Sequence, residues 1–240
     1  MALHFVDASA GPAQPGDVVV LTGSEAHHAA AVRRVRVGEE VTLTDGRGAW
    51  LAGSIEAAEK SRVDIRVSSR EERAAAAPRV LLAQALAKGD RDELAVQAAT
   101  ELGVDGVVPW QAARSVSRWQ GPKAEKGRER WASIVREAAK QALRAWIPEV
   151  EQVHTTAQLA GRAERILLLD PWTDSPLSAI APDERDVLLV VGPEGGIAPE
   201  ELAALEAAGA ERVRLGDSVL RTSTAGPAAL ALVNRALGRW

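Results

Sequence analysis

The stretch LLVVGPEGGIAPEEL, residues 188–202, indicates the fold of the larger part of this 240-residue chain. A short apolar run, typical of a parallel strand covered on both faces, ends in a turn with three glycines and a proline. The chain becomes helical again at Pro199, a residue favoured in the first turn of a helix. Ligands of open parallel sheets bind at the carboxyl ends of the strands. The turn is therefore either a tight strand–helix connection or part of a ligand site.

The segments around this stretch alternate between strand and helix patterns. Strands are predicted at 79–87, 103–110, 165–170, 186–192 and 211–216, and helices at 91–102, 123–145, 199–209 and 222–238. Asp90, followed three residues later by Glu93, has the spacing of a capping box at the start of a helix. This alternation predicts an α/β domain with a parallel sheet.

The first 70 residues have a different pattern, one typical of a small β domain. Runs rich in β-branched residues at 17–23, 39–46 and 61–69 predict strands, and the TDGRG sequence at 44–48 predicts a hairpin turn. Ser24 is placed to cap one helix over 25–35. A barrel or a sandwich would close these strands. With 71–78 read as a linker, the predicted domains are 1–72 and 73–240.

Composition excludes several kinds of chemistry. The chain has no cysteine, so disulfides, iron–sulfur clusters and thiol catalysis are ruled out. Apolar runs are shorter than a membrane helix needs, and the N-terminal sequence has no signal-peptide core, so we expect a cytoplasmic protein. The net charge is −4, yet residues 111–150 hold nine Lys and Arg against four Asp and Glu. This stretch is either a polyanion site or a solvated helix face.

The glycine turn lacks the features of common phosphate sites. Neither a P-loop nor a G-x-G-x-x-G pattern is present, and Glu194 inside the turn would repel a phosphate. A neutral or cationic ligand fits better. A second segment, VRLGDSVLRTSTAG at 213–226, repeats the arrangement of a strand, a glycine, a short loop and a hydroxyl-rich helix start. Two such loops at strand ends favour a ligand site.

These motifs resemble the bacterial 16S ribosomal RNA uridine N3-methyltransferases of the SPOUT superfamily. The similar segments are HHAAAVRRVRVGEEVTLTDGRG at 27–48, KGDRDELAVQAATELGV at 88–104, RERWASIVREAAKQALRAWIPEV at 128–150, and the two glycine loops. The resemblance implies a PUA-like β-barrel domain for RNA binding, followed by an α/β domain with a trefoil knot. It also implies a homodimer, S-adenosylmethionine (SAM) as cofactor, and 16S ribosomal RNA, in the assembled small subunit, as partner.

The resemblance also implies which residues contact the cofactor. By motif position these are Leu169, Gly192, Glu194, Gly195, Gly196, Leu215, Gly216, Leu220 and Arg221. Arg221 is the expected catalytic cation, because a positive charge would stabilise the uracil anion that develops as the N3 proton leaves. Its alternative is a structural ion pair with a carboxylate such as Asp217. Ser223 stands where the family commonly has glutamate, so Glu194 or a water would have to take the proton.

Several basic residues are candidates for contacts with the RNA backbone. They are Arg33, Arg34 and Arg36 in the β domain, and Lys88, Arg91 and Arg144 in the α/β domain. Thr222 and the two residues after it would either satisfy free N–H groups at a helix start or contact the ligand. Trp110, Trp119, Trp131 and Trp146 would either pack in the core or stack on bases.

Neighbouring histidines at 27 and 28 point apart on a helix, so no metal site is expected. Two other functions remain open from the sequence. One is methylation of a different RNA acceptor, either a ribose 2′-hydroxyl or a transfer-RNA base. The other is RNA binding without catalysis.

Overall fold

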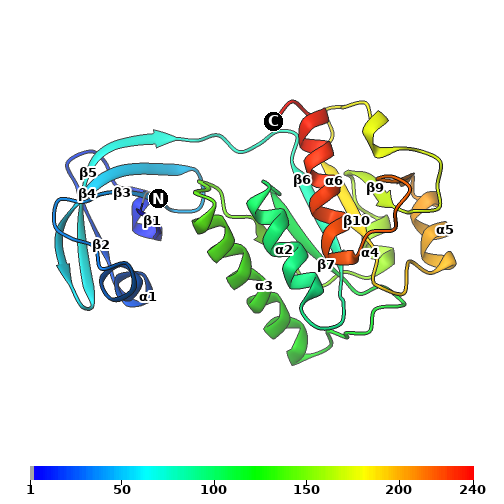
Figure 1. The fold of residues 1–240 in the computed structure, drawn as a ribbon, viewed down its shortest axis with the longest axis horizontal. Coiled ribbons are helices and arrows are strands. Elements are labelled where there is room, and N and C mark those ends of the chain that lie inside the picture. Colours follow the sequence, from blue (N-terminus) through cyan, green and yellow to red (C-terminus); the bar gives the residue numbers. More distant parts are fainter. Residues whose placement is uncertain (1–2) are drawn as a thin grey trace. The chain divides into compact units, whose positions relative to one another are not determined.

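The computed structural model describes residues 3–240 and divides the chain into two compact units (Figure 1). The first comprises Met1–Ala75 with Ala139–Ile147, and the second comprises Ala76–Ala138 with Pro148–Trp240. Among the residues described, no helix is long and apolar enough to cross a membrane.

The first unit is built on one five-stranded sheet. Its strands are β1 (Leu3–Val6), β2 (Val18–Leu21), β3 (Glu40–Thr44), β4 (Ala49–Glu59) and β5 (Arg62–Glu72), in the order β1-β3-β4-β5-β2. The pairing of β1 with β3 is parallel and the other pairs are antiparallel. Alternate residues of the strands, such as Leu51, Ile55 and Ile65, point into one apolar core. A single sheet rules out the predicted alternative of a two-sheet sandwich for these strands.

The predicted hairpin joins β3 to β4. Asp45 accepts hydrogen bonds from the backbone N–H groups of Arg47 and Ala49, at 2.7 and 3.1 Å. Gly46 and Gly48 have φ values of 78° and 109°, which glycine adopts without strain. The turn chemistry seen in the sequence therefore sets this connection.

The helix of the first unit differs from the prediction. Helix α1 spans Gly23–His27 with Thr22 at its N-cap, so Ser24 lies inside the first turn and does not cap it. The chain then continues as a π-helix, η2 (His28–Arg33), and ends at Arg34 in the left-handed conformation. A short 3-10 turn, η1 (Ala8–Ala10), precedes β2.

The segment Ala139–Ile147 belongs to the first unit, although the sequence placed it in the second domain. A nearly buried ion pair explains this assignment, because the Lys140 ammonium lies 2.9 and 3.0 Å from the two carboxylate oxygens of Glu25. The Trp146 indole also donates to the Arg73 carbonyl at 2.7 Å. These long-range contacts leave no local signal in the sequence.

The second unit contains a six-stranded, fully parallel sheet, which confirms the predicted α/β class. Its strands are β6 (Val80–Ala85), β7 (Gly106–Trp110), β8 (Glu149–Val150), β9 (Arg165–Leu169), β10 (Val187–Val191) and β11 (Glu211–Val213). Their order is β11-β9-β10-β6-β7-β8. The strand β8 is too short to have been recognised in the sequence.

Helices cover both faces of this sheet. They are α2 (Arg91–Glu101), α3 (Pro122–Gln141), α4 (Thr156–Ala160), α5 (Pro199–Ala207) and α6 (Thr222–Ala236), with one 3-10 turn, η3 (Leu177–Ala179). Helix α6 packs on β6 and β10, where its Gly226 lies against Leu82 and Val191. Alternate residues of these strands pack instead with Leu159 of α4 and Leu205 of α5. Burial on both faces accounts for the continuous apolar runs.

Two helix ends differ from the sequence prediction. Helix α3 ends at Gln141 rather than at residue 145, because Leu143 takes a left-handed φ of 56°. Asp90 occupies the N-cap of α2, but its side chain forms no capping bond. Asp92, in the first turn of the helix, accepts instead from the backbone N–H groups of Ala87 and Glu93 at 3.0 and 2.9 Å, and so joins the helix start to the loop after β6.

Candidate functional site

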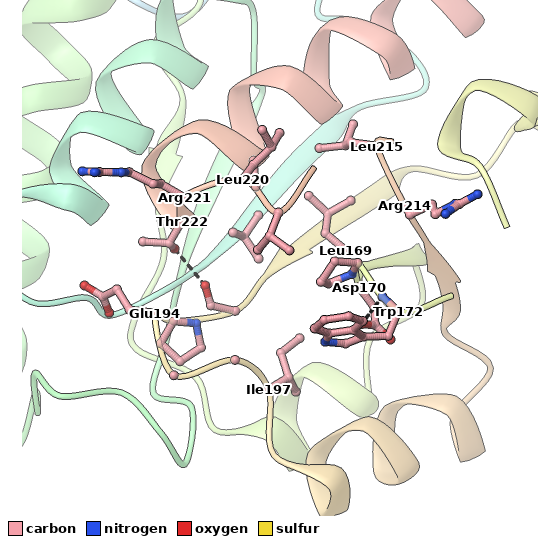
Figure 2. Close-up of a pocket in the computed structure, with 18 of the residues that line it drawn as sticks. Leu169, Asp170, Trp172, Glu194, Ile197, Arg214, Leu215, Leu220, Arg221 and Thr222 are labelled. Atoms are coloured by element: carbon pink, nitrogen blue, oxygen red, sulfur yellow. Dashed lines mark hydrogen bonds between the residues drawn. The ribbon is translucent and has the colours of Figure 1, made fainter. Parts of the chain in front are cut away.

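A pocket of about 630 Å³ lies in the second unit, at the carboxyl ends of β9, β10 and β11 and at the start of α6 (Figure 2). All the residues that the sequence placed at the cofactor line this pocket: Leu169, Gly192, Glu194, Gly195, Gly196, Leu215, Gly216, Leu220 and Arg221. The fold thus brings together two loops that are separate in sequence.

The glycines of the 192–196 turn have distinct physical roles. A Cβ at Gly192 would lie 2.6 Å from Ile197 Cγ1, so this glycine permits the tight packing of the turn. Gly196 has a φ of 73°, a left-handed conformation that favours glycine. A Cβ at Gly195 would meet only ordinary contacts, the shortest being 3.4 Å to Arg114 Cβ. Gly195 therefore leaves backbone open toward the pocket without being required by packing.

A buried chain of hydrogen bonds joins the two loops. The Thr222 hydroxyl donates to the Gly192 carbonyl at 2.8 Å and accepts from Gln84 Nε2, also at 2.8 Å. Gln84 is fully buried in β6. Neither predicted role of Thr222, capping helix N–H groups or contacting ligand, describes this contact. The Thr222 side chain instead fixes the start of α6 against the glycine turn.

Glu194 is held by the loop that follows β6. Its Oε1 accepts from the Lys88 backbone N–H at 3.0 Å and from the Arg91 guanidinium at 2.8 Å. Burial acts to raise the pKa of Glu194, but hydrogen bonds from backbone N–H groups and from Arg91 outweigh it and hold the pKa below its ordinary value. A carboxylate with a lowered pKa is a weak base. These contacts favour a structural role over the predicted role in proton removal.

The end of the pocket opposite Glu194 and Arg221 carries apolar and aromatic side chains together with the charged residues Asp170 and Arg214 (Figure 2). Trp172 lines it with 81% of its surface exposed. Its backbone N–H donates to the buried Asp170 carboxylate at 3.1 Å, and Asp170 in turn pairs with Arg212. Neither Trp172 nor Asp170 was predicted as a site residue from the sequence. The available signal was their position at the end of the strand predicted over 165–170, at the same sheet edge as the glycine turn.

The arginines of the pocket differ in their partners. Arg91 pairs with Glu194, and Arg214 lies 3.3 Å from Asp217. Asp217 is thus paired with Arg214, and not with Arg221 as the structural alternative required. Within residues 3–240, the Arg221 guanidinium forms no ion pair, and the backbone of this residue is the N-cap of α6. Its charge is available to a ligand.

The predicted RNA-binding residues fall in different parts of the chain. Lys88 and Arg91 lie beside the glycine turn, as just described. Arg33, Arg34 and Arg36 are exposed at the end of η2 in the first unit. Arg144 belongs to the first unit and follows the end of α3, so it lies outside the helix that was predicted over 123–145.

The four tryptophans of the basic stretch are divided between the units. Trp110 and Trp131 are buried, and Trp119 packs edge-on against Trp131 at 5.0 Å. Core packing therefore accounts for these three, while Trp146 lies in the first unit. Among the described residues, no cluster of His, Asp or Glu could hold a metal ion.

The fold and the site define a protein with a small β unit and an α/β unit that carries a ligand pocket made by two strand-end loops. Residues 75–234 match the family model of the RNA methyltransferase domain, and residues 21–68 match that of the RNA methyltransferase PUA domain. The chain belongs to this RNA methyltransferase family, and its N-terminal part is a PUA-like domain.

Relatives cover the whole chain. The "Ribosomal RNA small subunit methyltransferase E" of Mycobacterium bovis is 44% identical over 94% of this chain and 89% of its own length. A protein of the same name from Neisseria gonorrhoeae, solved with S-adenosyl methionine, is 27% identical with a TM-score of 0.89 over 98% of both chains. A Legionella pneumophila structure with bound SAM is 32% identical, with a TM-score of 0.85 over 98% of both.

Proposed function

We propose that this protein transfers a methyl group from SAM to N3 of a specific uridine in 16S ribosomal RNA of the small subunit. The observation that carries the proposal is the pocket, in which the matched cofactor motifs of a family of RNA methyltransferases converge at one sheet edge. SAM-bound structures with the same fold support the choice of cofactor.

The residues of the pocket fit SAM. Gly195 exposes backbone that a side chain would cover, and Leu169, Leu215 and Leu220 provide apolar walls for an adenosyl group. Trp172 adds an aromatic surface at the same end as Leu169 (Figure 2). The turn contains a carboxylate rather than a phosphate-binding pattern, which suits a ligand with a sulfonium cation.

Bound SAM supplies an electrophilic methyl group, and the protein's task is to position the acceptor and stabilise its charge. Arg221 serves as the cation, because the residue lines the pocket and its guanidinium has no carboxylate partner in the described chain. It stabilises negative charge on the uracil as the N3 proton leaves. Since Glu194 is tied to Arg91 and Ser223 has no carboxylate, we assign proton removal to water.

The acceptor follows from two features of the chain. Methylation at C5 of a pyrimidine requires thiolate addition at C6, and the chain has no cysteine. Attack by N3 requires no such adduct. The PUA-like domain and the relatives named small-subunit methyltransferases support ribosomal RNA over a ribose 2′-hydroxyl or a transfer-RNA base. Residues 1–72 would bind RNA, helped by Arg33, Arg34 and Arg36.

The proposal includes a SPOUT-type arrangement, with a trefoil knot in the region 73–240 and a homodimer in the cytoplasm. Three apolar side chains at the pocket support a second subunit nearby, because Trp172, Val219 and Leu220 are exposed in one protomer. Light scattering tests the dimer directly. A mass of one chain would reject this part of the proposal without affecting the pocket.

Methyl transfer tests the activity. Purified protein is incubated with methyl-labelled SAM and small ribosomal subunits from a strain that lacks the protein, and the digested RNA is analysed by mass spectrometry. We expect 3-methyluridine at a single site of 16S RNA. A different methylated nucleoside would reject the acceptor, and cofactor binding without transfer would indicate an RNA-binding protein that does not catalyse.

A further inference from the structure

Three loops meet at the Glu194 side of the pocket. The loop after β6 contacts the glycine turn through Lys88 and Arg91, and the loop after β7 contacts it through Arg114, whose Nη1 donates to the Gly195 carbonyl at 3.1 Å. The first two loops are joined by the Ser117 hydroxyl, which donates to the Ala87 carbonyl at 2.5 Å. All these contacts lie within the second unit.

These loops and the first residue of α2 carry four cations, which we call the basic platform: Lys88, Arg91, Arg114 and Arg118. The hydrogen-bond partners of these side chains show which of the charges are neutralised by a carboxylate. Arg91 is neutralised by Glu194, whereas within residues 3–240 Arg114 and Arg118 donate only to backbone carbonyls, the latter to Ala113 at 2.9 Å. A guanidinium has five N–H donors, so both arginines keep a full charge and most of their donors.

Hydrogen bonds to the side chains of Glu201 and Gln111 fix the loop that carries Arg114 and Arg118. Glu201 of α5 accepts from the Ala113 backbone N–H at 2.9 Å. Gln111 spans the loop, donating to the Ser117 carbonyl at 3.0 Å and accepting from the Trp119 N–H at 2.9 Å. Two exposed arginines on one loop, both without a carboxylate partner among the described residues, offer positive charge and free N–H donors to an anion. This arrangement suits a phosphodiester backbone.

We propose that Arg114 and Arg118 bind the RNA backbone beside the target nucleotide, so that the α/β unit holds the strand whose base enters the pocket. This inference rests on the proposed function, because it takes the ligand to be RNA. The proposal also changes which residues are expected to contact the RNA. Arg91 is paired with Glu194. Arg114 and Arg118, in the loop after β7, therefore provide the positive charge that is not paired with a carboxylate in the described chain. Arg114 touches the Gly195 carbonyl and so links bound RNA to the glycine turn.

The test measures binding of labelled small ribosomal subunits, from a strain lacking the protein, across a series of salt concentrations. The variants are Arg114→Gln and Arg118→Gln, and the control is Arg235→Gln. Arg235 is exposed near the end of α6 and forms no ion pair in the described chain. We expect each platform variant to lower the slope of log K against log salt by about 0.7–0.9, as for one lost phosphate contact.

The binding of S-adenosylhomocysteine (SAH) provides the second readout. Arg118 does not line the cofactor pocket, so Arg118→Gln should bind SAH within about twofold of the parent, a difference of roughly 0.4 kcal/mol. Salt slopes equal to that of the Arg235 control would overturn the proposal, as would equal losses of SAH and RNA binding in Arg118→Gln. If the parent protein itself binds no subunits, the proposed function fails before any variant is compared.

Discussion

The Thr222 hydroxyl lies 2.8 Å from the Gly192 carbonyl and 2.8 Å from Gln84 Nε2, and thereby joins the two loops of the pocket to the centre of the sheet. A hydroxyl can donate once and accept at the same time, so both contacts are made by one oxygen. Because Gln84 is fully buried, its amide donor would otherwise lack one of its partners. The Thr222 hydroxyl thus holds the start of α6 and the glycine turn together against β6.

Replacing Thr222 by valine keeps the shape of the side chain and removes both hydrogen bonds. Leaving a buried polar group unpaired costs about 1–3 kcal/mol. We expect Thr222→Val to weaken SAH binding about tenfold, measured by calorimetry, and Thr222→Ser to restore it. Equal affinities for the valine and serine variants would show that the hydroxyl does not position the loops.

Arg221 is expected to act on the rate more than on cofactor affinity. Removing a group that stabilises charge in the transition state costs about 100-fold in rate. We expect a loss of this size for Arg221→Gln in single-turnover methyl transfer, with partial activity in Arg221→Lys. A glutamine variant that transfers methyl groups at the parent rate would exclude Arg221 as the cation.

Trp172 should contribute to cofactor binding through its ring. Stacking of a base on an aromatic side chain contributes about 1–3 kcal/mol, so Trp172→Ala is expected to weaken SAH binding about tenfold or more. Trp172→Phe should retain most of the affinity. Trp240, which is exposed at the C-terminus, offers a matched control in Trp240→Ala. An effect on RNA binding alone would instead assign the indole to the target base.

His4 makes the stability of the first unit depend on pH. Burial, followed by the charges of Lys140 and Arg73, lowers the pKa of His4 from 6.5 to about 4. The unfolded chain therefore takes up a proton between these values while the folded chain does not, so stability falls as the pH drops from 6.5 toward 4.

This loss amounts to about 2 kcal/mol between neutral pH and about pH 5, at 1.36 kcal/mol for each unit. Urea unfolding at several pH values measures it. His4→Phe, which retains a ring to stack on Trp50, should remove most of the slope in this range. A slope unchanged by the substitution would assign the pH dependence to other groups.

The sequence predicted the elements that follow local rules and missed those set by distant contacts. Apolar runs identified the buried parallel strands, and the TDGRG turn identified the β3–β4 hairpin. The assignment of Ala139–Ile147 to the first unit depends on the Lys140–Glu25 pair, whose members are far apart in the chain. Likewise, α3 ends early, at Gln141, because Leu143 takes a left-handed φ, and leucine is not a helix-stop signature.

The residues of the candidate site divide in the same way, into those that local sequence patterns predicted and those that only the fold brings together. Glycines after strands pointed to the pocket because strand ends of a parallel sheet share one edge. The family resemblance, rather than periodicity, supplied the ligand. Trp172 and Arg114 were missed because an exposed tryptophan and a loop arginine have no distinctive spacing, and only the fold brings them to the glycine turn.

Titration of SAH against Gly195→Val is the most direct test that the glycine turn forms the cofactor site. A Cβ at this position meets Arg114 at an ordinary 3.4 Å, so the variant should fold with a melting temperature close to that of the parent. The valine side chain should cover the backbone that the ligand approaches. We predict no detectable SAH binding by the folded variant. Binding equal to that of the parent would place the cofactor elsewhere and contradict the account.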